Sequence, residues 1–177
     1  MISGIPKEEV ENVIALCSDI ISDALKKGIT ISTAESCTGG MIAGFLTAIS
    51  GSSQVFLGGV VAYSNALKQK VLGVSSETLK NHGAVSSETA LEMVRGVMEL
   101  TGASLSVSVT GVAGPGGGSN EKPVGQVCFA VKSSNGQEEV LTCQFPGDRE
   151  RVRFESAKKA LLLLRSILSK TISTSGS

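Results

Sequence analysis

The chain has 177 residues, a length typical of one domain, and its 16 basic and 16 acidic side chains give a formal net charge of zero. A neutral chain has no general attraction to nucleic acids or to anionic membranes, so we expect neither as a partner. Hydrophobic residues make up 41% of the chain, enough for a core, whereas aromatic residues make up only 3%, which disfavours a base-stacking surface.

The first hundred residues predict helices that alternate with strands. The longer helices show apolar residues at spacings of three and four, and the strands are rich in β-branched residues. We expect Gly28 to end the first helix, Ser86 to cap the last one, and the Gly58-Gly59 pair to mark a bulge or a crossing neighbour. In chain order the elements are a helix over 10–25, a strand over 30–34, a helix over 38–50, a strand over 54–63, and helices over 65–72, 76–81 and 86–100.

The rest of the chain predicts a strand, a glycine-rich loop, a hairpin and a final helix. The strand covers 104–110, the hairpin turns at Asn135-Gly136, and Asp148 caps the helix. Mixed helices and strands with one late hairpin predict an α/β fold, a three-layer α/β/α sandwich with a mixed central sheet. We expect one domain over residues 1–177, with a disordered tail over 171–177.

Neither the cysteines nor the single histidine show the spacing of a metal site. No C-x-x-C pair is present, so we expect four reduced thiols, no bound metal and no cofactor. The N-terminus lacks the pattern of a signal peptide, and no apolar run reaches the roughly 18 residues of a membrane span. These features predict a cytoplasmic protein without a membrane partner.

The segment from Glu35 to Gly40 lies between a predicted strand and a predicted helix. Ligands of α/β sheets bind at the carboxyl ends of strands, and the free N–H groups of a helix start favour an anion or an oxyanion. Hydroxyl side chains at this position are potential nucleophiles or donors to a ligand. The alternative is an ordinary helix start that Ser36 or Thr38 caps.

Two further segments follow predicted strands. The loop from Gly111 to Ser119 matches neither a P-loop nor a dinucleotide-binding pattern, and its glycines indicate a binding loop or a flexible connection. The segment from Tyr63 to Lys68 places a lysine near the rim of the sheet. Lys68 is either a solvated helix lysine or a desolvated base beside a nucleophile, and spacing does not decide between them.

Three more residues carry potential chemistry. Arg149 lies in a first helical turn, where acidic residues are preferred, so it is a candidate for binding a phosphate or a carboxylate. His82 is the only histidine, but its setting is that of a helix end. Ser156 begins an S-x-x-K pattern that lacks its usual partner motifs, so we discount it.

Several short motifs occur in one order along the chain. They are Thr-Ala-Glu-Ser-Cys-Thr-Gly-Gly at 33–40, Tyr-Ser-Asn at 63–65 with Lys68, His-Gly-Ala-Val-Ser at 82–86, Thr-Gly-Val-Ala-Gly-Pro at 110–115, Lys-Pro-Val-Gly at 122–125 and Phe-Pro-Gly-Asp-Arg at 145–149. Together they closely resemble the CinA C-terminal domain family, also called PncC, the nicotinamide mononucleotide deamidases. The resemblance spans about residues 8–168 and matches the form without an additional N-terminal domain.

The resemblance implies an amidohydrolase that converts nicotinamide mononucleotide to nicotinate mononucleotide and ammonia. It implies Ser36 as nucleophile, Lys68 as base and Tyr63 as a further catalytic residue, and a homo-oligomer, dimeric or larger. The substrate contacts expected with it are Glu35, Cys37, Thr38, Gly39, Gly40, Thr110, Gly111, Gly114 and Arg149.

Alternatives remain for the nucleophile and for the function. Cys37 is the other potential nucleophile, since it is adjacent to Ser36 and thiols are intrinsically more reactive. The rival functions are a non-catalytic nucleotide-binding module with a competence or regulatory role, and an amidohydrolase for a related carboxamide.

Overall fold

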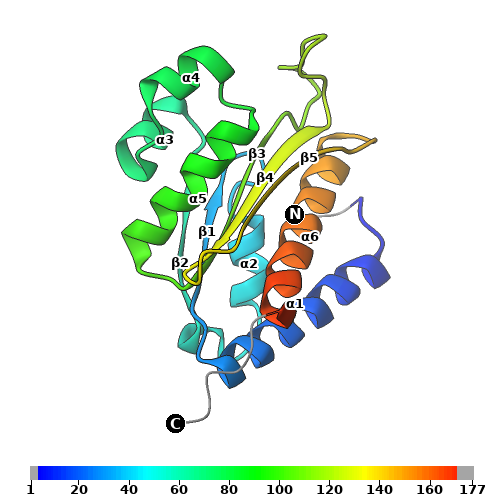
Figure 1. Ribbon diagram of the computed structural model, residues 1–177. Coiled ribbons are helices and arrows are strands. Elements are labelled where there is room, and N and C mark those ends of the chain that lie inside the picture. The colour runs from blue at the N-terminus through cyan, green and yellow to red at the C-terminus, as the bar shows by residue number, and fades with distance from the viewer. Residues whose placement is uncertain (1–3, 171–177) are drawn as a thin grey trace.

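Five strands form one mixed sheet at the centre of the molecule (Figure 1). The computed structural model describes residues 4–170. β1 runs parallel to both of its neighbours, whereas β4 is antiparallel to β3 and to β5, which confirms the predicted mixed sheet. In order across the sheet the strands are β2 (Phe56–Val61), β1 (Ile31–Glu35), β3 (Leu105–Gly111), β4 (Gln126–Ser133) and β5 (Glu138–Gln144).

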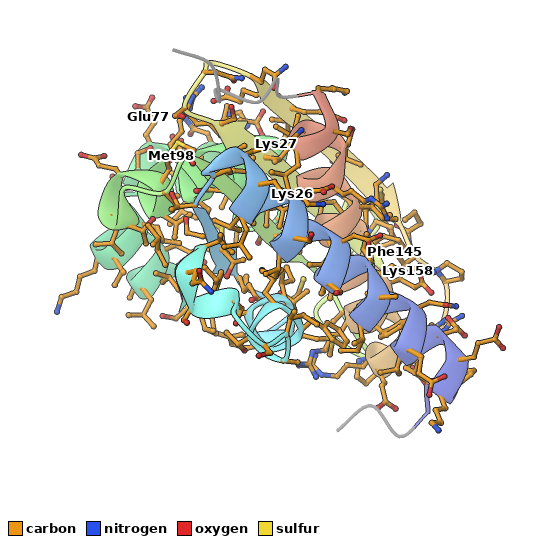
Figure 2. All side chains as sticks on the ribbon, turned by 90° about the horizontal axis from the view of Figure 1, so that it is seen from below. Lys26, Lys27, Glu77, Met98, Phe145 and Lys158 are labelled. Carbon is orange, nitrogen blue, oxygen red and sulfur yellow. The ribbon has the colours of Figure 1, made fainter. Side chains whose placement is uncertain are left out.

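Helices cover both faces of the sheet and complete the predicted α/β/α sandwich. On one face, α5 (Ser87–Thr101) packs on the sheet, and α3 (Asn65–Leu72) and α4 (Ser76–His82) pack beside it. On the other face lie α2 (Met41–Thr47) and α6 (Arg149–Lys170). The long helix α1 (Lys7–Lys27) lies across the outside of α2 and α6, as the view from below shows (Figure 2).

The alternation of side chains along β4 explains why both faces need a helical layer. Val127, Phe129 and Val131 are buried in the core that α1, α2 and α6 share. Cys128 and Ala130, which alternate with them, are buried in a smaller core beneath α5. Because successive side chains of a strand point to opposite faces, a strand buried on both sides requires a layer on each.

The predicted caps and turns are confirmed in most elements. The Ser86 side chain accepts the N–H of Thr89 at the start of α5, and Asp148 Oδ1 accepts the N–H of Arg151 at the start of α6. In β2, Ile31 pairs with Phe56 while Ser32 pairs with Gly58, so a bulge is present but lies at Leu57, one residue before the Gly58-Gly59 pair. The hairpin turn at 135–136 is present between β4 and β5.

The start of α2 differs from the prediction. The helix begins at Met41 rather than at residue 38, because Gly39 and Gly40 adopt left-handed conformations that end the preceding turn. Neither Ser36 nor Thr38 caps α2, so the alternative of an ordinary helix start capped by one of them is wrong. Instead the Glu35 carboxylate accepts the N–H groups of Ile42 and Ala43 at 3.1 and 2.8 Å. This leaves the hydroxyl groups of the turn available for other contacts.

Candidate functional site

The Ser36 side chain lies where the carboxyl ends of the three parallel strands meet. The Ser36 N–H donates to the carbonyl of Val109 on β3, and the N–H of Ala62, just after β2, donates to the carbonyl of Glu35 on β1. These bonds fix the segment that follows β1 between its two neighbours. The sheet therefore places Ser36 at the edge where ligands of α/β folds bind.

The Lys68 side chain reaches this edge from α3 and is buried, with 1% of its surface exposed. Its Nζ atom lies 2.8 Å from Ser36 Oγ and 2.8 Å from the carbonyl oxygen of Ala62. Ser64 caps α3 by accepting the N–H of Leu67, which fixes the helix that carries the lysine. The structure thus brings together the two residues expected as nucleophile and base, and Lys68 is not a solvated helix lysine.

The surroundings of Lys68 favour its neutral form. Burial lowers the pKa of the Lys68 amine below its ordinary value of 10.5. Among residues 4–170, no carboxylate lies within ion-pair distance of Nζ. An ammonium group has three N–H donors, and here two acceptors face it. In the structure Nζ donates to both the Ser36 hydroxyl and the Ala62 carbonyl. Once the amine is neutral, it can keep its donation to Ala62 and accept the Ser36 O–H on its lone pair.

For the neighbouring thiol, of Cys37, burial has the opposite consequence for reactivity, because its neutral form is the unreactive one. Cys37 is buried, and burial raises the pKa of its thiol to about 12. The nucleophilic form of cysteine is the thiolate, so a thiol with this pKa is a poor nucleophile near neutral pH. The structure therefore favours Ser36 over Cys37 as the nucleophile.

A cavity of about 200 Å³ opens directly on the Ser36–Lys68 pair. Seven of the expected site residues line it, whereas Asn65, Ala84, Val85 and Ala113 line it without having been predicted. These four residues belong to motifs that the sequence did single out. Their place in those motifs was the signal that could have identified them as site residues. The expected residues that line the cavity are Ser36, Cys37, Tyr63, Lys68, Thr110, Gly111 and Arg149.

Arg149 joins three parts of the cavity wall. Its guanidinium donates to the carbonyl of Gly114 and to the Tyr63 hydroxyl, each at 2.9 Å. Gly114 therefore supports the site through its carbonyl and does not itself line the cavity. The Thr110 hydroxyl donates to the carbonyl of Ala84 at 2.7 Å, which ties β3 to the segment before α5. Arg149 keeps further N–H groups for a ligand, since a guanidinium has five donors.

Besides Gly114, four residues predicted to contact substrate do not line the cavity. Glu35 is buried and caps α2, so its carboxylate is already occupied by backbone N–H groups. Thr38 is buried, and its hydroxyl has no partner within the described part of the chain. Gly39 and Gly40 line a separate groove along α2, because the turn carries the backbone past the end of the sheet.

A residue that the sequence did not reveal holds this turn in place. Arg153 on α6 donates from Nε to the carbonyl of Cys37 at 3.1 Å and from Nη2 to the carbonyl of Thr38 at 2.8 Å. The N–H group of Thr38 has no hydrogen-bond partner among residues 4–170, whereas the N–H of Cys37 faces its own thiol. In a trans peptide the C=O and the N–H point in opposite directions. By holding the Cys37 carbonyl, Arg153 therefore fixes the direction of the Thr38 N–H.

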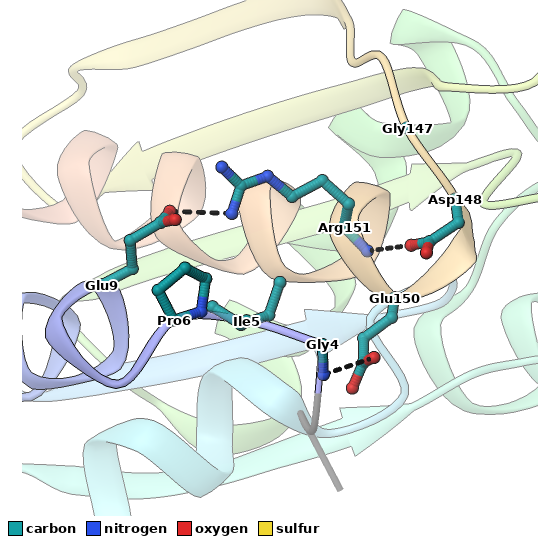
Figure 3. Close-up of a pocket in the computed structure, with 8 residues that line it drawn as sticks. All are labelled: Gly4, Ile5, Pro6, Glu9, Gly147, Asp148, Glu150 and Arg151. Atoms are coloured by element: carbon teal, nitrogen blue, oxygen red, sulfur yellow. Dashed lines mark hydrogen bonds and ion pairs between the residues drawn. The ribbon is translucent and has the colours of Figure 1, made fainter.

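The other features weighed from the sequence lie outside this cavity. His82 is the last residue of α4, where its Nδ1 lies 3.5 Å from Glu88 Oε1. Ser156 is buried in α6 and donates to the carbonyl of Val152. A second hollow, of about 340 Å³, lies where the N-terminal segment meets α6 (Figure 3). There Glu9 accepts a hydrogen bond from Arg151, and Glu150 accepts one from the N–H of Gly4. These contacts attach the N-terminal segment to α6.

Residues 4–170 contain neither a metal-binding cluster nor a membrane-spanning helix. No group of three or more His, Cys, Asp or Glu side chains in this part of the chain is placed to hold a metal ion. No helix within the same range has both the length and the apolar character needed to span a bilayer.

Comparisons with known proteins agree with one another. The model of the CinA C-terminal domain matches residues 14–168. A CinA-like protein of Thermotoga sp. (strain RQ2) is 45% identical over 165 residues, which cover 93% of this chain and 38% of that protein, so the chain spans less than half the length of this relative.

Two solved structures share the fold and much of the sequence. The competence/damage inducible protein CihA from Agrobacterium tumefaciens is 45% identical, with a TM-score of 0.87 over 89% of this chain and 96% of that one. A competence-damaged protein (CinA) superfamily protein from Klebsiella pneumoniae is 36% identical, with a TM-score of 0.86 over 90% of this chain and 99% of that one. The chain therefore belongs to the CinA C-terminal domain family.

Proposed function

We propose that this protein is an amidohydrolase that converts nicotinamide mononucleotide to nicotinate mononucleotide and ammonia. The observation that carries the proposal is the buried Ser36–Lys68 pair, which faces a cavity and whose amine has no carboxylate within ion-pair distance among residues 4–170. A serine needs an adjacent base to become a nucleophile, and a desolvated lysine is such a base. The choice of substrate follows the resemblance of the site motifs to the nicotinamide mononucleotide deamidases.

The reaction begins with attack of Ser36 Oγ on the carboxamide carbon. The Ser36 proton passes to Lys68 Nζ over the 2.8 Å between the two atoms. The tetrahedral intermediate collapses by breaking its C–N bond, and Lys68 returns the proton to the departing ammonia. Water then attacks the acyl-enzyme ester with Lys68 again as base, which releases the nicotinate carboxylate and restores Ser36.

The negative charge of the tetrahedral intermediate requires hydrogen-bond donors close to Ser36. The N–H groups of Cys37 and Thr38, the second of which has no partner among residues 4–170, are the donors we assign to this oxyanion. A well-aimed donor of this kind contributes about 3–4 kcal/mol to transition-state stabilisation. Arg153 contributes indirectly, because it holds the carbonyl groups on the opposite side of the turn.

The remaining parts of the site suit a phosphorylated nucleoside. Arg149 has free donors at the cavity wall, and the glycine-rich segment that begins at Gly111 offers backbone N–H groups to a phosphate. We place the reaction in the cytoplasm, because all four cysteines are free thiols and reduced thiols are typical of that compartment. The proposed chemistry uses no cofactor.

The test is ammonia release from nicotinamide mononucleotide by the purified chain in the presence of EDTA, with Ser36→Ala as the matched control. The proposal expects release by the wild-type chain and none by the variant. Tight binding of the nucleotide without release by either protein would favour a nucleotide-binding module. Release from another nicotinamide-like carboxamide alone would move the assignment to a related substrate.

A further inference from the structure

Asn65 is the one polar side chain of the cavity wall that forms no hydrogen bond with any residue of 4–170. It is the first residue of α3, and it lines the Ser36–Lys68 cavity. A side-chain amide has two N–H donors and a carbonyl oxygen that accepts. All of these groups are therefore available to a ligand in the cavity.

The other polar side chains of the wall already have partners within the described part of the chain, the Cys37 thiol through its own backbone. They are Ser36, Cys37, Tyr63, Lys68, Thr110 and Arg149. The wall is also rich in donors and poor in strong acceptors. Lys68 and Arg149 supply N–H groups, whereas none of the lining residues carries a carboxylate, and Asn65 has the only side-chain carbonyl oxygen among them.

A primary carboxamide needs both kinds of group. Its carbonyl oxygen accepts hydrogen bonds, and the N–H groups assigned to the oxyanion can supply them. Its NH₂ group has two donors, and a donor that leaves water without finding an acceptor is costly. The Asn65 Oδ1 atom is the acceptor that the wall offers to this NH₂ group.

The helix α3 places Asn65 on the side of the leaving nitrogen. Asn65 and Lys68 are three residues apart, so their side chains leave the same face of the helix with Cβ atoms about 5–6 Å apart. Ser64 caps this turn by accepting the N–H of Leu67 at 3.2 Å, which fixes the backbone that carries Asn65. In the proposed reaction Lys68 Nζ returns its proton to the departing nitrogen, so that nitrogen lies next to Lys68 and within reach of the Asn65 side.

We propose that Asn65 makes this site specific for a primary carboxamide, by accepting a hydrogen bond from the NH₂ group that leaves as ammonia. The inference rests on the proposed function, since it names the residue that recognises the group to be hydrolysed. It assigns Asn65 to the substrate's nitrogen, and the N–H groups of Cys37 and Thr38 to the substrate's oxygen. The two sets of contacts orient the amide plane between Ser36 Oγ and Lys68 Nζ.

The contact with Asn65 becomes stronger as the C–N bond breaks. Lys68 transfers its proton to the nitrogen, and the electron pair of the breaking bond stays on the nitrogen, which leaves as ammonia. The nitrogen gains positive charge while it is protonated, and a charged donor forms a stronger hydrogen bond to Oδ1 than the neutral amide does. An interaction that strengthens in the transition state raises the rate. An ester has no N–H on its leaving group, so it gains nothing from Asn65.

The test compares nicotinamide mononucleotide with the methyl ester of nicotinate mononucleotide. Both substrates give the same product, nicotinate mononucleotide, so one chromatographic assay yields kcat/KM for each. The quantity of interest is the ratio of the amide value to the ester value. Asn65→Ala should lower this ratio by about 10-fold to 100-fold, the range for one lost hydrogen bond to a desolvated donor. Effects on Ser36 or Lys68 act on both substrates and cancel in the ratio.

Two further variants separate recognition from a structural role. Asn65→Asp keeps an acceptor oxygen at the same position and should keep the ratio within a few-fold of the wild-type value. Gln69→Ala is the matched control, because Gln69 is an exposed side-chain amide on the same helix and does not line the cavity. Its ratio should be unchanged. Circular dichroism checks folding, and Asn65→Leu replaces Asn65→Ala if the latter does not fold.

The outcomes distinguish this inference from the proposed function. Formation of product from both substrates with an unchanged ratio in Asn65→Ala would overturn the inference and leave the proposed function standing. An equal fall of the ratio in Asn65→Asp or in Gln69→Ala would also overturn it, because the effect would then not depend on the acceptor oxygen. Absence of product from the amide with the wild-type chain would overturn the proposed function and the inference together.

Discussion

Replacement of Lys68 by methionine separates the chemical role of the lysine from its structural role. Methionine fills a similar volume but provides no base and no donor, so Ser36 loses its proton acceptor and the Ala62 carbonyl loses its partner. Loss of a general base lowers a rate by about 10²–10⁴-fold. At 1.36 kcal/mol for each factor of ten, this is about 3–5 kcal/mol of transition-state stabilisation.

The pH dependence identifies the group that is lost. Because burial lowers the pKa of Lys68, wild-type kcat/KM should rise as pH rises through that lowered pKa, where the amine becomes neutral. Stability should rise over the window from the lowered pKa to 10.5, since there the unfolded chain binds the proton that the folded chain releases. Lys68→Met should lose both dependences.

The assay is ammonia release across pH, accompanied by urea unfolding at several pH values. Lys70→Met is the matched control, because Lys70 is an exposed lysine on the same helix and should leave activity and both pH dependences unchanged. A Lys68→Met variant that keeps the wild-type pH profile of kcat/KM would refute lysine as the base. Equal loss of activity in Lys70→Met would show a general effect of α3.

Three further predictions follow from the site and its supports. Ser36→Ala should abolish ammonia release with little change in the thermal unfolding midpoint, whereas Cys37→Ala should keep most of its activity because the thiol stays protonated. Arg153→Met should lower kcat by roughly 10-fold to 100-fold with little change in KM, a smaller effect than deletion of an oxyanion donor. Arg165→Met, on the exposed side of α6, is the control and should leave kcat unchanged. Asp148→Ala should lower the free energy of unfolding by about 1 kcal/mol in urea, through loss of the α6 cap. The contrary results would be residual turnover in Ser36→Ala, unchanged kcat in Arg153→Met, and an unchanged urea midpoint in Asp148→Ala.

Most of the architecture was predictable because it depends on local patterns. The apolar spacing of α1 and α5, the strand alternation of β3 and the turn at 135–136 are each set within a few residues of sequence. The start of α2 was not predictable in the same way. Its cap comes from Glu35, a residue seven positions before its nearest partner, rather than from a hydroxyl beside the helix.

The site was predictable in part. Motif order brought out Ser36, Lys68 and Arg149, but the burial of Lys68 depends on how α3 packs on the sheet, which spacing does not reveal. Arg153 was missed because its partners lie more than a hundred residues earlier in the chain. The groove on α2 was missed for a related reason, since the glycines at 39 and 40 were expected to face the substrate.

The Glu35 cap also determines when the nucleophile becomes ordered. The carboxylate connects the end of β1 to the start of α2, and Arg153 binds the turn between them, so Ser36 lies in a segment held at both ends and in its middle. The loss of conformational entropy needed to orient Ser36 therefore occurs during folding. An incoming substrate then meets an ordered nucleophile, and more of its binding free energy remains available for affinity.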